Sequence, residues 1–183
     1  MLPESAGKIL VDIARKAIEC RFTGKETIIP DEDFLQSERG VFVTLSKNGE
    51  LRGCIGFPEP VFPLGLAVRK AAVGAAFTDP RFPPVEEKEL KEIKIEVSVL
   101  TLPEEIHAVD PQDYEDVIKI GKDGLIIEMD GQSGLLLPQV AAEWNWDVKE
   151  FLEQICYKAG LPPDAWLSEE AKLYKFEAQI FTE

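Results

Sequence analysis

Residues 51–56, LRGCIG, and the segments just before them are the most informative part of the sequence. Residues 41–45 (VFVTL) are apolar or β-branched, a composition that favours a strand. Asn48 and Gly49 follow, and both tolerate the positive φ angles of the type I′ turn that joins the strands of a tight hairpin. The sequence therefore predicts an antiparallel hairpin in which residues 51–56 form the return strand.

The second half of the chain repeats this order. Asp130-Gly131 is another hairpin turn signal, and Asp147 with Glu150 forms a capping box that opens a helix. Each half is predicted to contain a hairpin, a helix and a strand: residues 41–56, 64–77 and 95–100 in the first half, and residues 125–137, 147–159 and 174–181 in the second. Because hairpins imply antiparallel pairing, we predict an α+β fold: a mainly antiparallel sheet built from a duplicated hairpin-helix-strand unit, with flanking helices.

The length of 183 residues suits one domain, residues 1–183, with two lobes of about 1–103 and 104–183 as a finer possibility. The net charge is −14, and no basic run is present, which argues against nucleic-acid binding because phosphates must be neutralised by Lys and Arg. No apolar run approaches the ~20 residues that span a membrane. The three cysteines are widely spaced, which indicates reduced thiols in a cytoplasmic protein.

The alternation of side chains along a strand gives the return strand two faces. It predicts that Leu51 and Ile55 share one face and that Arg52 and Cys54 share the other. A guanidinium beside a thiol favours the thiolate, which would suit a nucleophile, a redox-sensitive thiol or an anion-binding site. The alternative is that Cys54 is a small buried side chain used for packing.

Three more residues are candidates for ligand binding. Glu96 alternates with apolar residues in the predicted strand 95–100, and an antiparallel neighbour could bring it opposite Arg52. Asp79 and Arg81 lie in a connector stiffened by prolines, and such loops often present functional groups. Each of these side chains could instead serve structure alone, as an ion pair or a turn cap.

Several kinds of site are absent from the sequence. There is no phosphate loop or dinucleotide fingerprint, and no closely spaced Cys/His pairs that could hold zinc. We therefore expect no metal and no cofactor. Nucleophilic catalysis at Cys54 would also need a base, and the one histidine, His107, lies in the segment that links the halves.

Residues 51–56 closely resemble the signature of the AMME-syndrome candidate-gene-one family, whose domain is called AMMECR-type. Further segments that look like family segments are residues 40–45, 75–85, 95–100, 134–140 and 156–161. The resemblance implies an α+β domain with a cleft near the signature. The family has no agreed molecular activity, but its members occur alone or in company with Memo-type and radical-SAM proteins, which implies an association with those partners.

Our leading hypothesis is a cytosolic domain that binds an anionic small molecule or a polypeptide at a cleft near Arg52 and Cys54. The alternative is an enzyme that uses Cys54 for group transfer or thiol redox chemistry. A third hypothesis is a protein-interaction scaffold, which would carry a contiguous exposed apolar patch away from the signature.

Overall fold

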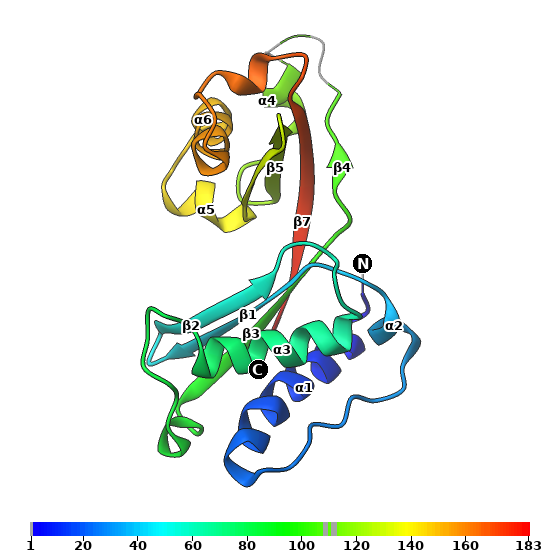
Figure 1. Ribbon diagram of the computed structural model, residues 1–183, viewed down its shortest axis with the longest axis vertical. Coiled ribbons are helices and arrows are strands. Elements are labelled where there is room, and N and C mark those ends of the chain that lie inside the picture. Colours follow the sequence, from blue (N-terminus) through cyan, green and yellow to red (C-terminus); the bar gives the residue numbers. More distant parts are fainter. Residues whose placement is uncertain (1, 108–109, 111–112) are drawn as a thin grey trace. The chain divides into compact units, whose positions relative to one another are not determined.

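The computed structural model describes residues 2–107, 110 and 113–183. The chain forms two compact units, described separately below (Figure 1). Unit 1 comprises Met1–Leu100 and Gln179–Glu183, and unit 2 comprises Thr101–Ala178. We expected lobes of about 1–103 and 104–183; residues 179–183 instead group with the N-terminal part of the chain.

The fold is α+β, as predicted, with helices and an antiparallel sheet. In the part of the chain that the structure describes, the sheet has seven strands, hydrogen-bonded in the order β2-β1-β3-β7-β5-β6, with β4 paired to β7. The strands are β1 (Val41–Lys47), β2 (Glu50–Phe57), β3 (Ile93–Leu100), β4 (Glu104–Glu105), β5 (Asp123–Met129), β6 (Gln132–Leu136) and β7 (Lys172–Thr182).

Helices occur in both units. They are α1 (Glu4–Thr23), α2 (Asp33–Gln36), α3 (Leu64–Phe77), α4 (Asp113–Val117), α5 (Pro138–Glu143) and α6 (Val148–Ala159), with short 3-10 helices η1 (Glu87–Glu89) and η2 (Ala165–Leu167). None of the helices in the described ranges is both long enough and apolar enough to cross a membrane.

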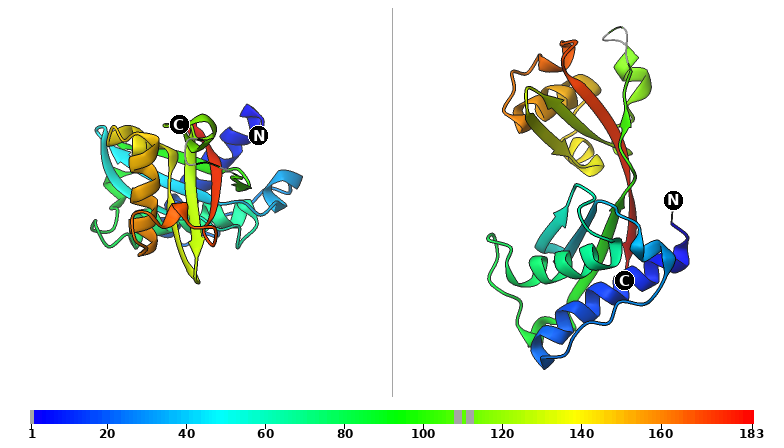
Figure 2. Two further views of the ribbon diagram at one scale, coloured as in Figure 1. Left: turned by 90° about the horizontal axis from the view of Figure 1, so that it is seen from above. Right: turned by 45° about the vertical axis from the view of Figure 1, so that its right-hand side comes forward.

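In unit 1, the central strand β1 pairs with β2 on one side and β3 on the other. The predicted turn is present, because Asn48 has a φ of 54° and Gly49 a φ of 84°. Helices α1 and α3 lie side by side against one face of these strands (Figures 1 and 2). Val41, Val43 and Leu45 of β1 point into the core under the helices, so alternation along β1 defines a helix-covered face and an opposite face, here called the open face.

A β-bulge changes the faces of β2 from those predicted. Leu45 is opposite Gly53 but Ser46 is opposite Leu51, so Arg52 is the extra residue. Leu51 therefore lies on the same face as Cys54, rather than with Ile55. The expectation that Arg52 and Cys54 share a face is wrong, because the bulge shifts the alternation by one residue between them.

In unit 2, β5 pairs with β6 and with β7. The predicted turn is again present, with Asp130 at a φ of 53° and Gly131 at 76°. Helix α6 begins at the predicted capping box, in which Asp147 Oδ1 accepts a hydrogen bond from the Glu150 backbone N–H at 2.8 Å. Its apolar side packs against β5 and β6.

The order hairpin, helix, strand thus occurs in each unit. In each, the first strand of the hairpin also pairs with the later strand: β1 with β3, and β5 with β7. The two units therefore resemble each other in the order and pairing of their elements, which does not by itself show that the unit was duplicated.

Candidate functional site

Cys54 lies on the open face of β2, next to a hydroxyl. Thr44 of β1 is directly opposite Cys54, and its Oγ1 donates a hydrogen bond to Cys54 Sγ at 3.3 Å. On its other side Thr44 is opposite Glu96 of β3. Three neighbouring strands therefore place a thiol, a hydroxyl and a carboxylate in one row on the open face of unit 1.

This register corrects the expected position of Glu96. We expected Glu96 opposite Arg52 on adjacent strands, but β1 lies between β2 and β3. The residue directly opposite Glu96 is Thr44, and the guanidinium of Arg52 donates to Glu89 instead. Glu96 is thus a neighbour of Thr44 and not a partner of Arg52.

The backbone of Cys54 is held by two side chains of the connector after α3. Its N–H donates to Asp79 Oδ2 at 2.9 Å, and its carbonyl oxygen accepts from Arg81 Nη2 at 3.0 Å. Because β2 is at the edge of the sheet, these groups would otherwise face outward without a strand partner. The Asp79–Arg81 pair, named here the edge clamp, takes the place of that missing strand at Cys54.

The edge clamp is itself a tight ion pair. Arg81 donates to Asp79 through Nη2 at 2.7 Å and through Nε at 3.0 Å. The Asp79 side chain is only 2% exposed, whereas the Arg81 side chain is 53% exposed. The hydrogen bonds from Arg81 and from the Cys54 backbone hold the pKa of Asp79 well below its ordinary range. A buried carboxylate therefore fixes the orientation of a solvent-facing guanidinium beside Cys54.

Arg81 is also the cationic side chain that hydrogen-bonds the backbone of Cys54. The pKa of Arg81 is raised, chiefly by its hydrogen bonds to Asp79 and to a lesser degree by interaction with Cys54. Phe82 supports the same guanidinium, whose Cζ lies 5.6 Å from the centre of the ring. Arg81, rather than Arg52, is thus the arginine that accompanies the thiol.

Arg52 forms an ion pair with Glu89, away from Cys54. Its Nε and Nη2 each donate to the Glu89 carboxylate at 3.1 Å, and Lys47 Nζ lies 3.2 Å from the same group. Lys47 is opposite Ile93, a core residue, so this cluster is at the margin of the helix-covered face. The hydrogen bond from Arg52 is the main reason that the pKa of Glu89 falls to about 2. Arg52 therefore ties β2 to η1.

Of the five predicted site residues, the structure brings Cys54, Asp79 and Arg81 into contact. It places Glu96 in the same row and Arg52 on the other face. Sequence reasoning missed Thr44, which a correct strand register would have placed opposite Cys54. His107 is exposed and belongs to unit 2. No group of three or more His, Cys, Asp or Glu side chains suited to a metal ion occurs in residues 2–107, 110 and 113–183.

Comparison with known proteins places the chain in a family. The family model described as AMMECR1 matches residues 11–181. A protein of Methanothermobacter thermautotrophicus is 54% identical over 185 aligned residues, covering 100% of this chain and 96% of that protein. One from Thermococcus onnurineus is 55% identical, covering 97% of this chain and 90% of the other.

A solved structure agrees with these matches. The crystal structure of the uncharacterized protein PH0010 from Pyrococcus horikoshii is 50% identical, with a TM-score of 0.86, and the match covers 100% of this chain and 93% of that one. The chain belongs to the AMMECR1 family, whose molecular function is unknown.

Proposed function

We propose that the chain binds an anionic small molecule, or an anionic group of a polypeptide, on the open face of unit 1 beside Cys54. The residues we assign to this site are Cys54, Thr44, Arg81 and, as the support of Arg81, Asp79. Glu96 borders it. This assignment replaces Arg52 with Arg81 as the cationic group.

The observation that carries the proposal is the fixed but exposed guanidinium of Arg81. Three hydrogen bonds from Nε and Nη2, to Asp79 and to the Cys54 carbonyl, hold it in place. Its Nη1 makes no hydrogen bond to any described residue, and the side chain is 53% exposed. A guanidinium that is already oriented loses little further entropy when it binds a carboxylate or phosphate.

The test uses two alkylating reagents that differ in charge. In a Cys20→Ser background Cys54 is the accessible thiol, because Cys156 is buried. An anion-binding group beside Cys54 should favour anionic iodoacetate over neutral iodoacetamide, relative to the same ratio for the unfolded chain. We expect Arg81→Gln to abolish this preference and Lys88→Gln, which removes an exposed charge elsewhere in unit 1, to preserve it.

An unchanged reagent preference in Arg81→Gln would contradict the proposal. So would a folded protein whose ratio equals that of the unfolded chain. Because Asp79 loses a partner in Arg81→Gln, circular dichroism must first show that the variant is folded under the conditions of the assay.

A second candidate function is an enzyme that uses Cys54 as a nucleophile. The observation that favours it is the hydrogen bond from Thr44 Oγ1 to Sγ, because donors to sulfur stabilise a thiolate. This candidate predicts fast alkylation by iodoacetamide near neutral pH, slowed in Thr44→Val. A rate in the folded chain that matches an ordinary unfolded thiol at every pH would exclude it.

We also propose, from the recurring element order and from the unpaired cysteines, two properties of the whole chain. The two hairpin-helix-strand units derive from a duplication, and the protein works in the reducing cytoplasm. The first would gain support from matching residues at equivalent positions of the two units in a broad set of relatives.

A further inference from the structure

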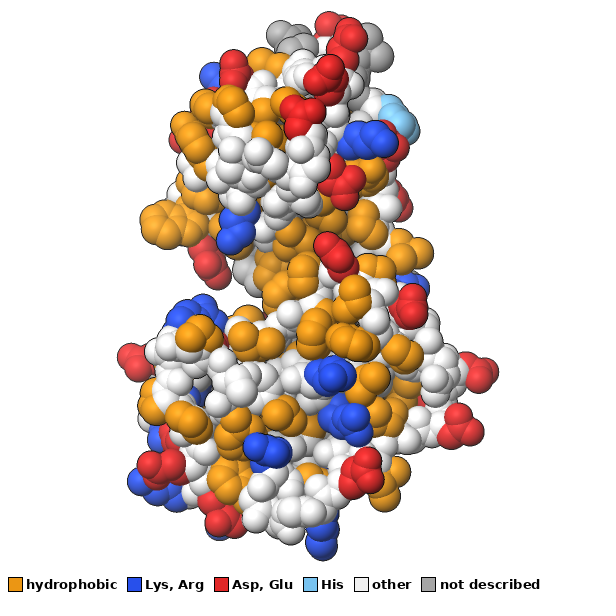
Figure 3. All heavy atoms as spheres, viewed as in Figure 1, with side chains coloured by type: hydrophobic (Ala, Val, Ile, Leu, Met, Phe, Trp, Pro, Cys, Tyr) orange, Lys and Arg blue, Asp and Glu red, His pale blue; other side chains and the backbone are white. Residues whose placement is uncertain are grey.

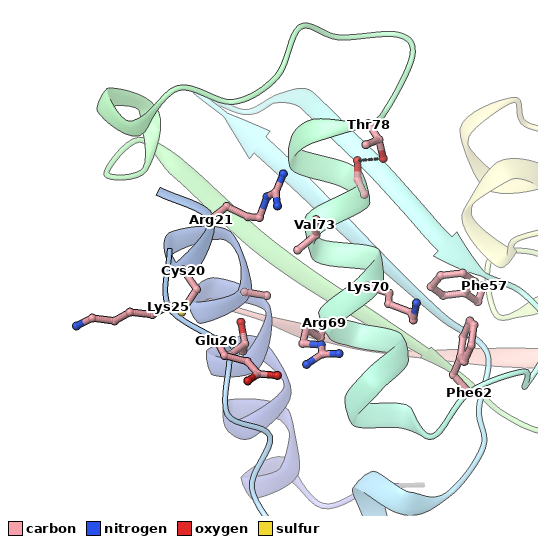
Figure 4. A pocket seen from close by; sticks show the side chains of 13 residues that line it. Cys20, Arg21, Lys25, Glu26, Phe57, Phe62, Arg69, Lys70, Val73 and Thr78 are labelled. Carbon is pink, nitrogen blue, oxygen red and sulfur yellow. Dashed lines mark hydrogen bonds between the residues drawn. The ribbon is translucent and has the colours of Figure 1, made fainter. Parts of the chain in front are cut away.

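Unit 1 contains a groove between α1 and α3, on the helix-covered side of the sheet. Its volume is about 520 Å³, within the range that binds small molecules. Helix α1 contributes Cys20 and Arg21, and α3 contributes Arg69, Lys70 and Val73 (Figure 4). The groove uses neither Cys54 nor Arg81, so it is separate from the site proposed above.

The charge of the groove is opposite to that of the chain. Acids outnumber bases 34 to 20 in the whole sequence. The residues that line the groove include four bases, Arg21, Lys25, Arg69 and Lys70, and one acid, Glu26. Figure 3 shows basic side chains gathered among hydrophobic ones over α1 and α3. A local basic cleft on an acidic protein concentrates anions.

The cations that face the groove have no polar partner among the described residues, although Arg21 and Lys70 contact aromatic rings. In Figure 4, Arg21 and Arg69 extend into the space between the helices, whereas Lys25 extends away from it. No hydrogen bond or ion pair joins Arg21, Arg69 or Lys70 to another described residue; Arg21 lies over the Phe77 ring, with its Cζ 5.8 Å from the centre. Their donors are therefore free for a ligand.

The exposed side of α3 is apolar around these cations. Leu66, Arg69, Lys70, Val73 and Phe77 recur at helical spacing and are all partly or fully exposed. The solvent-facing side of an ordinary surface helix is polar. A face that combines apolar side chains with unpaired cations matches a ligand that has an anionic group and an apolar part.

An aromatic pair at one end of the groove marks the position of the apolar part. Phe57 and Phe62 meet edge to face, with ring centres 5.2 Å apart. Lys70 Nζ lies 5.0 Å from the centre of the Phe62 ring, between the aromatic pair and Arg69 (Figure 4). Aromatic and charged contacts therefore follow one another along the groove.

We infer that this groove binds a phosphorylated small molecule with an aromatic or apolar moiety. Arg69 and Lys70 of α3 receive the phosphate, and Phe57 and Phe62 contact the organic part. Arg21, at the Phe77 end of the groove, adds positive charge. A phosphate dianion, with three terminal oxygens, can accept bidentate hydrogen bonds from the guanidinium of Arg69 and still reach the ammonium of Lys70.

The experiment is a calorimetric titration of the full chain with phenyl phosphate, a probe that carries both chemical features. We expect saturable binding that weakens with salt, and binding at least about tenfold weaker for inorganic phosphate and for phenol. The double variant Arg69→Gln/Lys70→Gln should lose about a hundredfold in affinity, because it removes two charge-assisted contacts of roughly tenfold each.

The matched control is Lys8→Gln/Lys94→Gln, which removes the same charge from exposed positions of unit 1 outside the groove and should bind phenyl phosphate as the wild type does. A second readout is Cys20, which lines the groove: in Cys54→Ser, phenyl phosphate should slow its alkylation. Absence of saturable binding, equal loss in both double variants, or unprotected Cys20 would overturn the inference. The reagent preference at Cys54 tests the other site independently.

Discussion

The hairpins of the two units share a close contact with a helix but differ at their outer edges. In unit 1, the backbone of Ala75 in α3 packs against Gly53 of β2; in unit 2, Ala159 of α6 packs against Gly134 of β6. β2 and β6 are the strands at the two ends of the strand order. Side chains hold the edge of β2 at Cys54, whereas no side chain hydrogen-bonds the backbone of β6 in the described residues.

The hairpin architecture therefore does not require an edge clamp. The β5–β6 hairpin has the same turn type, antiparallel pairing without a bulge and a comparable helix contact, but no clamp. The clamp on β2 is therefore an addition to the fold, and it fixes a guanidinium at the one strand position that carries a thiol. That is the physical basis for assigning function to unit 1.

The largest expected effect is the difference in stability between variants of Arg52, in β2, and Arg81, in the connector after α3. Arg52→Gln removes a side chain that is only 12% exposed and that donates two hydrogen bonds to Glu89, and it should lower the free energy of unfolding by about 4 kcal/mol. Glu89 would keep Lys47 and the Glu86 N–H as partners. Arg81→Gln should cost only about 1 kcal/mol, because Arg81 is exposed and Asp79 keeps two backbone donors. Urea unfolding followed by circular dichroism measures both. Equal losses would contradict the structural role given to Arg52.

The next effect compares the two helix contacts. In Gly53→Ala, the new Cβ would occupy the place of the Ala75 carbonyl oxygen, and we expect a loss of about 3 kcal/mol. In Gly134→Ala, the nearest atom to a Cβ is Ala159 N at 2.8 Å, and the loss should be about 1 kcal/mol. Thermal unfolding of the two variants, side by side, would show the opposite order if α3 could shift away from β2.

A third effect is confined to unit 1 at low pH. Glu89 has its pKa lowered from an ordinary value near 4.5 to about 2. The stabilisation it provides is fully present above pH 4.5 and is lost as the pH falls towards 2, at most about 3 kcal/mol. Asp79 acts in the same direction, because its pKa is also lowered.

Two probes separate the units in this acid titration. Trp144, Trp146 and Trp166 all belong to unit 2, so their fluorescence reports on that unit. Hydrogen exchange of peptides from β2 and α3 reports on unit 1. We expect exchange in unit 1 to rise before tryptophan fluorescence changes, and a smaller acid-induced change in Glu89→Gln. Simultaneous changes at the same pH in both would count against a role for Glu89.

The smallest effect belongs to unit 2. Asp147→Ala removes the N-cap of α6 and should cost about 1 kcal/mol. The N-cap position of α3 is Pro63, with no side-chain cap, so unit 1 offers no equivalent change. Tryptophan fluorescence during urea unfolding should register the shift, and Asp147→Asn should retain most of the stability. A variant indistinguishable from wild type would show that packing alone holds the end of α6.

The sequence predicted what depends on neighbouring residues. Both hairpin turns, the bounds of α3 and the capping box at Asp147 follow from local backbone and side-chain chemistry. The pairing of β1 with both β2 and β3 does not follow from neighbouring residues, and for that reason Glu96 was wrongly predicted to lie opposite Arg52. The bulge at Arg52 had no local signal either. It arises with the ion pair to Glu89, which is 37 residues away in the sequence.

The candidate site was therefore predicted in composition but not in arrangement. Cys54, Asp79 and Arg81 were named, and their contact required the connector after α3 to return to the edge of β2. Thr44 was missed because its role depends on the register of β1 against β2.

The alkylation of Cys54 also tests whether Arg81, and not Arg52, is the cation that attracts anions to this thiol. Folded Cys20→Ser protein is treated with an equimolar mixture of iodoacetate and iodoacetamide, and mass spectrometry gives the carboxymethylated fraction at Cys54. We predict that this fraction falls to the value of the unfolded chain in Arg81→Gln and stays high in folded Arg52→Gln. A fraction that falls in Arg52→Gln and holds in Arg81→Gln would contradict the account.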